Sequence, residues 1–304
     1  METLTVPEWL LFPMRMFAGE TERLIHVGIE TLGKSKVAFV GLARDCGRAL
    51  RSNLTNLQNF GSGCREWCLH IEENDSTDDT VQVLRDFCAE HRQATFTSRK
   101  LGRERYGNEF AGRRTIRLGE YRTACQQWVR DCAPDADFVV MVDWDQCGWS
   151  QHGVIHGFGC MTEMQDAYGM ASVSLLEAKV AESDGKEIIL KRGWLHYDTW
   201  TLRINTWWDD YTAGQGAWKH QWLPPVGSPP AHVLTAFGGL AIYRTADWLQ
   251  GTYDGREDCE HVVLHRTMQE RTGKRLYLNP TQRCVMQFLP PDDEATDGGK
   301  HGND

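Results

Sequence analysis

The feature that most constrains the fold is an apolar run, residues 138–142, that leads directly into the triplet Asp143-Trp144-Asp145. Consecutive apolar residues with no polar alternation are typical of a strand buried on both faces, as in a parallel sheet covered by helices. Open α/β sheets bind ligands at the carboxyl ends of their strands. Because side chains alternate along a strand, Asp143 and Asp145 are expected to point to the same side at that edge.

Two neighbouring carboxylates at a sheet edge suit a divalent cation. A hard cation relieves their mutual repulsion and binds through one or two carboxylates together with the phosphate oxygens of a substrate. The pair Asp143 and Asp145 therefore predicts a Mn²⁺ or Mg²⁺ site beside a phosphate-bearing ligand. The alternative interpretation is a pair of ordinary solvated surface acids.

The first half of the chain alternates predicted strands and helices. Apolar runs and stretches with helical spacing follow one another at residues 37–43, 50–60, 67–71, 81–91, 121–132 and 138–142. This order is typical of a doubly wound, mostly parallel sheet flanked by helices. Residues 97–118 are basic and rich in glycine, and they are predicted to form a loop that either closes over an anionic ligand or is simply solvated.

The second half has a different pattern. Strand-like runs are predicted at residues 171–176, 187–190, 237–243 and 275–278. An aromatic-rich region spans 194–222, and its tryptophans either stack on sugar rings or belong to the core. Residues 292–304, rich in Asp and Gly, are predicted to be a disordered tail.

Composition excludes several classes of protein. The net charge of -9 over 304 residues argues against nonspecific nucleic-acid binding, which depends on Lys and Arg. No apolar run is long enough for a membrane span, and the ten scattered cysteines favour free thiols in a cytoplasmic protein. The run Trp9-Leu10-Leu11-Phe12 is too short and too acidic in its flanks for a signal peptide. Residues 1–34 are expected to pack as an extension, with peripheral membrane contact as the alternative.

Five elements in chain order resemble those of GT-A glycosyltransferases. They lie at residues 72–80, 143–145, 196–203, 236–243 and 259–262. The chain is similar over residues 36–286 to the fungal capsule-associated α-1,3-mannosyltransferase family and its bacterial and viral relatives. The triplet at 143–145 departs from the fungal members, so donor and metal details transfer less directly.

The resemblance implies a set of ligand-binding residues. Donor contacts are expected from Ala43, Arg44, Glu73, Asp75, Arg122, Asp143, Gly238 and Gly239. The metal shell is expected to consist of Asp143, Asp145 and His261, with His265 as the second choice for the histidine.

The same resemblance implies the residues for chemistry. Asp198 is expected to accept hydrogen bonds from sugar hydroxyls, and Arg203 to bind phosphate or to orient Asp198. Asp258 or Glu260 is the candidate general base if the reaction inverts the anomeric configuration.

The resulting expectation is a single GT-A domain over 35–291, with a nucleotide-binding half at 35–150 and an acceptor half at 151–291. It implies a metal-dependent hexosyltransferase that uses GDP-mannose or a UDP-sugar and a carbohydrate acceptor. The favoured version transfers a mannosyl group with retention of the anomeric configuration. Two alternatives stay open. A nucleotidyltransferase acting on sugar phosphates shares the fold and the acidic site, and a non-catalytic carbohydrate-binding protein would use the tryptophans alone.

Overall fold

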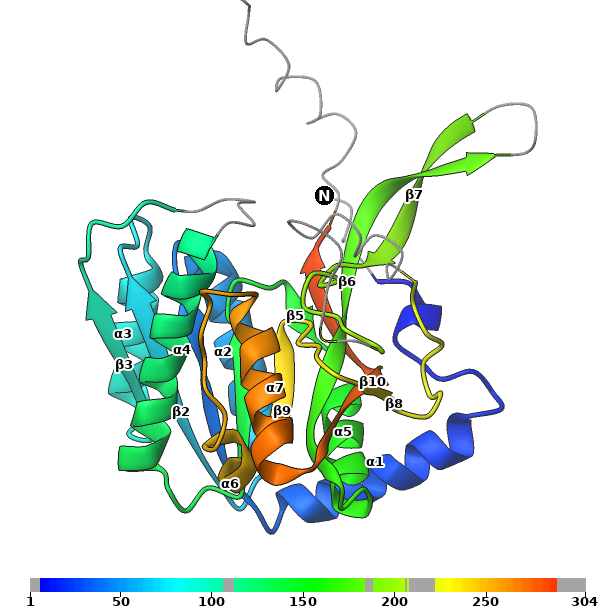
Figure 1. The fold of residues 1–304 in the computed structure, drawn as a ribbon, viewed down its shortest axis with the longest axis horizontal. Coiled ribbons are helices and arrows are strands. Elements are labelled where there is room, and N and C mark those ends of the chain that lie inside the picture. Colours follow the sequence, from blue (N-terminus) through cyan, green and yellow to red (C-terminus); the bar gives the residue numbers. More distant parts are fainter. Residues whose placement is uncertain (1–5, 106–111, 184–187, 206, 208–221, 289–304) are drawn as a thin grey trace, which may run out of the picture.

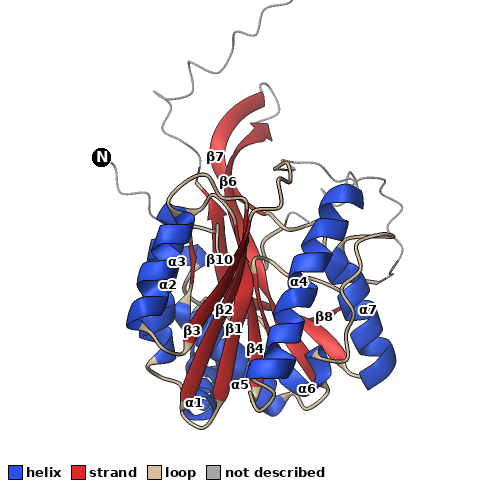
Figure 2. Ribbon diagram, turned by 90° about the vertical axis from the view of Figure 1, so that its left-hand side faces the viewer, coloured by secondary structure: helices blue, strands red, loops and turns tan. Residues whose placement is uncertain are grey.

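The computed structural model describes residues 6–105, 112–183, 188–205, 207 and 222–288. Helices cover both faces of one central sheet, so that the domain has three layers (Figure 2). The predicted tail at 292–304 lies outside the described residues, as do Trp208, Tyr211 and Trp218 of the aromatic region.

The described strands form one mixed sheet. Its order is β3 (Ala94–Arg99), β2 (Glu66–Asn74), β1 (Lys36–Ala43), β4 (Phe138–Asp143), β9 (Leu240–Arg244), β6 (Ala167–Ser183), β10 (Arg275–Gln287) and β5 (Gly148–Trp149). The first four strands are parallel, whereas β9 runs antiparallel to both β4 and β6. Two further strands pair outside this path, β7 (Ile188–His196) with β6 and β8 (Ala231–Val233) with β10. The β6–β7 hairpin extends beyond the body of the domain (Figure 1).

One face of the sheet is covered by α1 (Ala18–Leu32), α2 (Gly47–Gly61), α3 (Thr80–Glu90) and α5 (Gln151–Glu163). The other is covered by α4 (Gly112–Cys132), α6 (Thr245–Trp248) and α7 (Glu260–Thr272). A short 3₁₀ turn, η1 (Glu8–Leu10), precedes α1. The two faces bury separate hydrophobic clusters, which meet only through the sheet.

Helix α2 shows how the sequence pattern becomes packing. Its residues Leu50, Leu54, Leu57 and Phe60 recur at intervals of three and four, as predicted, and all are buried in the cluster that also contains apolar residues of β1 and β2. Burying an apolar side chain of this size contributes about 1.5–3 kcal/mol of transfer free energy. The helix begins directly after β1, so this packing also fixes the loop at the carboxyl end of that strand.

The N-terminal segment is part of the domain. Helix α1 lies against α5, and the backbones approach so closely that a Cβ on Gly28 would fall 2.0 Å from the carbonyl oxygen of Ile155. Leu24 and Leu32 bury their side chains in the cluster on that face. None of the described helices combines the length and apolar character that a membrane-spanning segment requires.

Two local predictions were wrong. Residues 97–118 are not one loop, because β3 continues to Arg99 and α4 begins at Gly112. Strand β3 is an edge strand with Ala94 as its one buried residue, so it lacks the apolar run that marks the other strands. The helical spacing of residues 121–132 also predicts a buried Cys132, but this residue is exposed, and α4 instead buries polar side chains next to Cys125, notably Arg122.

Candidate active site

The acidic triplet lies where β4 ends. Asp143 is the last residue of the strand and its side chain is 25% exposed, Trp144 is fully buried, and Asp145 is exposed. Asn53 of α2 donates hydrogen bonds to the carbonyl oxygens of Trp144 (3.1 Å) and Gln146 (2.7 Å). The buried tryptophan and the asparagine therefore fix the backbone that carries the two carboxylates.

A cleft opens in front of this triplet, between the carboxyl ends of β1, β2 and β4 and the first turns of α4. Both carboxylates line it, together with Ala43, Asn74 and Tyr121. Its other charged lining residues are Arg44, Arg103, Glu104, Arg105, Arg114, Arg117 and Arg122. Six arginines thus face three carboxylates, so this cleft is suited to an anionic ligand. It is called the donor cleft because the sequence predicts donor contacts by several residues that line it.

Arg122 joins the two sides of the site. Its side chain is buried, its Nη2 donates to Oδ1 of Asp143 at 3.1 Å, and its Nε lies 3.1 Å from Oε1 of Glu260 on α7. The guanidinium also lies over the ring of Phe237, 4.9 Å from its centroid. The third nitrogen, Nη1, has no hydrogen-bond partner.

Negative charge accumulates around Asp143. Burial raises the pKa of Asp143 to about 7, although the guanidinium of Arg122 lowers it. The carboxylates of Asp145, Asp198 and Glu260 raise the pKa further. One buried guanidinium among four carboxylates leaves an excess of negative charge, which a divalent cation would relieve.

The donor set fits a metal held largely by oxygen. Within the described ranges no three His, Cys, Asp or Glu side chains are arranged as a complete metal site. Asp143 and Asp145 are neighbouring carboxylates at the cleft wall, and Mg²⁺ or Mn²⁺ completes its shell with water and phosphate oxygens where the protein supplies few ligands.

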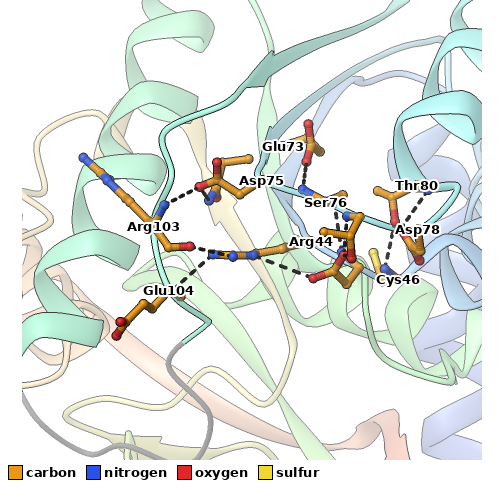
Figure 3. A network of polar contacts seen from close by, with 12 residues as sticks. Arg44, Cys46, Glu73, Asp75, Ser76, Asp78, Thr80, Arg103 and Glu104 are labelled. Carbon is orange, nitrogen blue, oxygen red and sulfur yellow. Dashed lines mark hydrogen bonds and ion pairs between the residues drawn. The ribbon is translucent and has the colours of Figure 1, made fainter.

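The predicted nucleotide element at 72–80 forms a network of polar contacts (Figure 3). Glu73 is buried, and its carboxylate accepts hydrogen bonds from the backbone N–H of Ser76 (2.8 Å) and the hydroxyl of Ser98 (2.5 Å). Glu73 does not line the donor cleft, whereas its neighbour Asn74 does. The contact of Glu73 with a nucleotide stays a prediction.

Asp75 caps the loop that follows β3. Its carboxylate accepts backbone N–H bonds from Leu101 (2.6 Å), Gly102 (2.8 Å) and Arg103 (3.1 Å). Burial raises the pKa of Asp75, but these bonds and one from Asn74 outweigh it and bring the pKa down to about 2. Asp75 thus positions the loop that supplies Arg103 and its neighbours to the cleft.

A second set of contacts joins the β1–α2 and β2–α3 loops. Asp78 accepts the backbone N–H of Gly47 at 2.9 Å, and Thr80 accepts that of Cys46 at 2.8 Å. Ser76, which has the sequence of an N-cap, instead accepts the N–H of Asp45, because α3 begins four residues later at Thr80. This element therefore fixes the two loops that border the donor cleft.

Arg44 also acts on a loop. Its guanidinium donates to the carbonyl oxygens of Arg103 (2.7 Å) and Glu104 (3.2 Å), while its side chain lines the donor cleft (Figure 3). Ala43 lines the cleft at the end of β1, in the position expected from the strand order.

A second cleft continues from the first. The two share Arg114, Leu118, Arg122 and Asp143, and the second adds residues from the second half of the chain: Tyr197, Asp198, Trp200, Thr201, Phe237, Gly239, Cys259, Glu260, His261 and Met286. The second cleft is called the acceptor cleft because most of its lining belongs to the predicted acceptor half. In it, Oδ2 of Asp198 accepts the backbone N–H of Gly238 at 2.8 Å. Gly238 has φ +70, and a Cβ there would lie 2.0 Å from the carbonyl oxygen of Ser172. Asp198 and Asp143 thus lie on opposite halves of one continuous opening.

Arg203 and Asp258 form a pair beside this cleft. Nη2 of Arg203 lies 3.1 Å from Oδ1 of Asp258, which also accepts the N–H of Cys259. Both residues hold the turn that leads into α7, and neither lines either cleft. Of the two candidate bases, Glu260 is the one that lines the acceptor cleft, although its side chain is largely buried.

The two histidines of α7 differ in their surroundings. His265 is fully buried, with Nδ1 2.7 Å from the Thr235 hydroxyl and Nε2 2.8 Å from the Tyr243 hydroxyl. His261 lines the acceptor cleft, stacks on Phe237 at 4.0 Å, and has no hydrogen-bond partner at either ring nitrogen. Burial, followed by Arg122 and His265, lowers the pKa of His261, which keeps its imidazole neutral.

Sequence reasoning missed some residues of the site. The apolar run at 237–243 predicts a strand that includes Phe237, but this residue precedes β9 and packs between Arg122 and His261. Leu118 and Tyr121 line the donor cleft from α4, a position that its helical spacing alone does not reveal. The sequence identifies residues 97–118 as basic, but it does not show that several of these arginines line the donor cleft.

Comparison with known proteins concerns the fold. No protein-family model and no curated protein matches the sequence. Among solved structures, the chain is similar to GalNAc-T7 with UDP, GalNAc and Mn²⁺, at a TM-score of 0.50 and 9% identity over 94% of this chain and 55% of that chain. The chain has the GT-A fold.

Two further structures are similar at lower scores. A mannosyltransferase from Pyrobaculum calidifontis, in complex with GDP-mannose and Mn²⁺, gives a TM-score of 0.48 and 13% identity over 91% of this chain and 67% of that one. The glucosyl-3-phosphoglycerate synthase of M. tuberculosis gives 0.48 and 13% over 89% and 78%. This chain spans little more than half of the GalNAc-T7 chain, so a GT-A domain accounts for only part of that protein.

Proposed function

We propose that the protein is a metal-dependent glycosyltransferase that moves a hexosyl group from a nucleoside-diphosphate sugar to a carbohydrate acceptor. The observation that carries the proposal is the position of Asp143 and Asp145. They end β4 at the wall of a cleft that six arginines line, on a GT-A fold. The adjoining acceptor cleft, lined by Asp198 and by the aromatic side chains of Tyr197 and Trp200, supplies a place for a second sugar.

The donor occupies the first cleft in this proposal. Asp143 and Asp145 would hold Mn²⁺ or Mg²⁺ there, and His261 is the third candidate ligand because neither of its ring nitrogens has a hydrogen-bond partner. Bound there, the metal stabilises negative charge on the departing nucleoside diphosphate. Nη1 of Arg122 is free to donate a further hydrogen bond to a phosphate oxygen in either cleft.

The acceptor side supplies the groups for chemistry. Oδ1 of Asp198 is left to accept a sugar hydroxyl, since Oδ2 is held by Gly238. Glu260 lines the acceptor cleft and lies 3.1 Å from Nε of Arg122, so it is the better candidate than Asp258 for a base or a charge-stabilising carboxylate. Arg203 then has a positioning role through Asp258.

The finer assignments follow the sequence resemblance. A mannosyl group from GDP-mannose and retention of anomeric configuration are what the similarity to the capsule-associated family favours. A cytoplasmic location, with peripheral membrane contact through the exposed side chains of Trp9, Phe12, Met14 and Met16, belongs to the same proposal.

A donor screen tests the function. We expect UDP- or GDP-sugars to raise the melting temperature with Mn²⁺ present, because a ligand that binds only the native state stabilises it by mass action. Slow hydrolysis of the stabilising donor should also require the metal. Transfer of a nucleotidyl group to a sugar phosphate would identify a nucleotidyltransferase instead. If the protein binds sugars but no donor at any metal concentration, it is a non-catalytic carbohydrate-binding protein.

The histidine assignment has its own test. His261→Ala should raise the Mn²⁺ concentration needed for half-maximal donor hydrolysis, and His265→Ala should do so less, because its ring is held by Thr235 and Tyr243. If the His265 variant alone shows the metal defect, the ligand assignment is wrong by one helical turn. If neither variant changes the metal requirement, the carboxylates hold the metal with water and phosphate.

A further inference from the structure

Arg114 lies where the two clefts meet. It belongs to the first turn of α4, its side chain is half-buried, and it lines both the donor and the acceptor cleft. Asp143 and Arg122 also line both clefts, but their charged groups are paired with each other. Arg114 is therefore placed to contact a ligand on the acceptor side as well as a donor.

Most arginines of the donor cleft have partners within the protein. Carboxylate partners within 4.0 Å are Asp45 for Arg44, Glu120 for Arg103 and Arg117, and Asp143 and Glu260 for Arg122. No carboxylate of the described residues pairs in this way with Arg105 or Arg114. A half-buried guanidinium without a counter-charge is available to an anion from outside the protein.

The neighbours of Arg114 are aromatic. Its guanidinium carbon lies 5.8 Å from the centroid of the Trp200 ring, and its charge acts on the phenol of Tyr197. Tyr197 is 46% exposed, and both rings line the acceptor cleft. Aromatic faces stack on the apolar faces of sugar rings, so this corner combines a surface for a sugar with a positive charge.

The donor alone does not account for the positive charge. Six arginines face Glu104, Asp143 and Asp145 in the donor cleft. Carboxylates pair with Arg44, Arg103, Arg117 and Arg122, so the positive charge without a counter-charge among the described residues is that of Arg105 and Arg114. A divalent cation offsets the charge of the donor diphosphate, so a metal-bound donor need not neutralise this remaining charge. A further anionic group in the ternary complex would compensate it.

We propose that the acceptor is an anionic carbohydrate, whose carboxylate or phosphate group is bound by Arg114 and whose ring lies against Tyr197 and Trp200. This inference rests on the proposed function for the meaning of the acceptor cleft. It adds the chemical class of the acceptor and assigns Arg114 as a specificity-determining residue.

Binding of small probes to the donor-free protein tests the inference. Methyl α-mannoside serves as the neutral probe, glucuronic acid as the carboxylate probe and mannose 6-phosphate as the phosphate probe, with affinities from titration NMR. We expect at least one anionic probe to bind about tenfold more tightly than the neutral one, since a charge-assisted hydrogen bond contributes that much or more. High salt should reduce the difference by screening.

Matched variants assign the effect. Arg114→Gln should remove the preference for the anionic probe, Arg114→Lys should restore part of it, and Arg113→Gln should leave it unchanged, because Arg113 is exposed and lines neither cleft. Equal binding of neutral and anionic probes to the unmodified protein overturns the inference. So does an Arg114→Gln variant that binds UDP and GDP less tightly but keeps the preference for anionic probes, since Arg114 would then serve the donor.

The two proposals fail separately. Nucleotide-sugar binding and hydrolysis are measured without any acceptor. If the protein prefers an anionic sugar through Arg114 but binds no donor, the transferase proposal is wrong and the proposal of an anionic ligand is supported. Donor hydrolysis together with indifference to the charge of the probe would do the reverse.

Discussion

The buried guanidinium of Arg122 lies 3.1 Å from the buried carboxylate of Glu260 on a different helix. The same guanidinium bonds to Asp143. Arg122 thus links α4 to both β4 and α7, and it joins the donor half of the site to the acceptor half.

Removing Arg122 alone should destabilise the fold. In Arg122→Met, Glu260 is left buried and unpaired, which costs about 3–5 kcal/mol of unfolding free energy for such pairs. The double variant Arg122→Met, Glu260→Met should regain most of that stability, since apolar replacement of a buried pair is often neutral. Urea unfolding measures both. A single variant as stable as the unmodified protein would show that the pair contributes nothing.

Metal affinity should rise with pH. A carboxylate must be deprotonated to bind a cation, and the pKa of Asp143 is about 7, so affinity for Mn²⁺ should increase from about pH 6 to about pH 8. In the metal-free protein the sign is opposite. The folded state keeps a proton that the unfolded chain loses near its usual pKa of about 4, so stability falls as the pH rises toward 7. Titration calorimetry with Mn²⁺ checks the first trend and thermal melts the second.

Asp145→Asn is the companion variant for this prediction. Asp145 is exposed, so its substitution should leave the melting temperature nearly unchanged while metal-dependent donor hydrolysis is lost. Full hydrolysis by the double Asn variant at positions 143 and 145 in EDTA would eliminate the metal hypothesis.

Asp75→Ala should loosen the loop that follows β3. Its carboxylate accepts three backbone N–H bonds, and leaving such donors unpaired costs about 1–3 kcal/mol each where they are buried and less at this partly exposed site. Because the pKa of Asp75 is about 2, its contribution in the unmodified protein is present above pH 4 and is lost as the pH falls from about 4 toward 2. Acid melts of both proteins test this. Parallel pH profiles would contradict it.

Gly238→Ala should destabilise the fold more than the control variant Gly273→Ala. Both glycines have positive φ, +70 and +67, but nothing lies within 4 Å of a Cβ at Gly273. The control should therefore lose about 1 kcal/mol, the usual cost of a left-handed alanine. A Cβ at Gly238 also meets the carbonyl of Ser172 and displaces the N–H that Asp198 accepts, so stability and sugar binding should both fall further. Equal losses in the two variants would show that the contact is harmless.

Arg283→Met should be neutral or stabilising. Arg283 is 1% exposed and donates to the carbonyl of Pro224, while Nε and Nη1 have no hydrogen-bond partner and no carboxylate pairs with it among the described residues. Burial lowers its pKa to about 10, which shows the cost of holding the charge there. Methionine fills similar volume without that cost. A loss of more than about 2 kcal/mol would mean that the guanidinium has a partner in solution.

The strands and helices with strong patterns were predictable. Uninterrupted apolar runs gave β1, β2 and β4, and regular spacing gave α2, because burial on two faces or on one stripe leaves a direct trace in the sequence. Strand β3 has no such apolar run, since it lies at the edge of the sheet. The strand order of the second half could not be predicted either, because the pairing of β9 between β4 and β6 depends on contacts between distant residues.

The candidate site follows the same division. The cleft position of Asp143 and Asp145 could be predicted, since strand ends fix it. The hydrogen bonds that Glu73 and Asp75 accept from loop N–H groups could not be predicted. An acidic residue that binds a ligand and one that caps a loop look the same in a sequence. The pairing of Arg203 with Asp258, and of Arg122 with Glu260, required the tertiary fold.

The place of β9 in the sheet has a consequence during synthesis. Until β9 is made, the apolar strand β4 has no partner on one side and presents an open edge to other chains. Such an edge is a template for aggregation. About a hundred further residues separate β4 from β9, and their synthesis takes several seconds or more. During that time the edge of β4 must be shielded in some other way, and it is covered within the chain only when β9 docks.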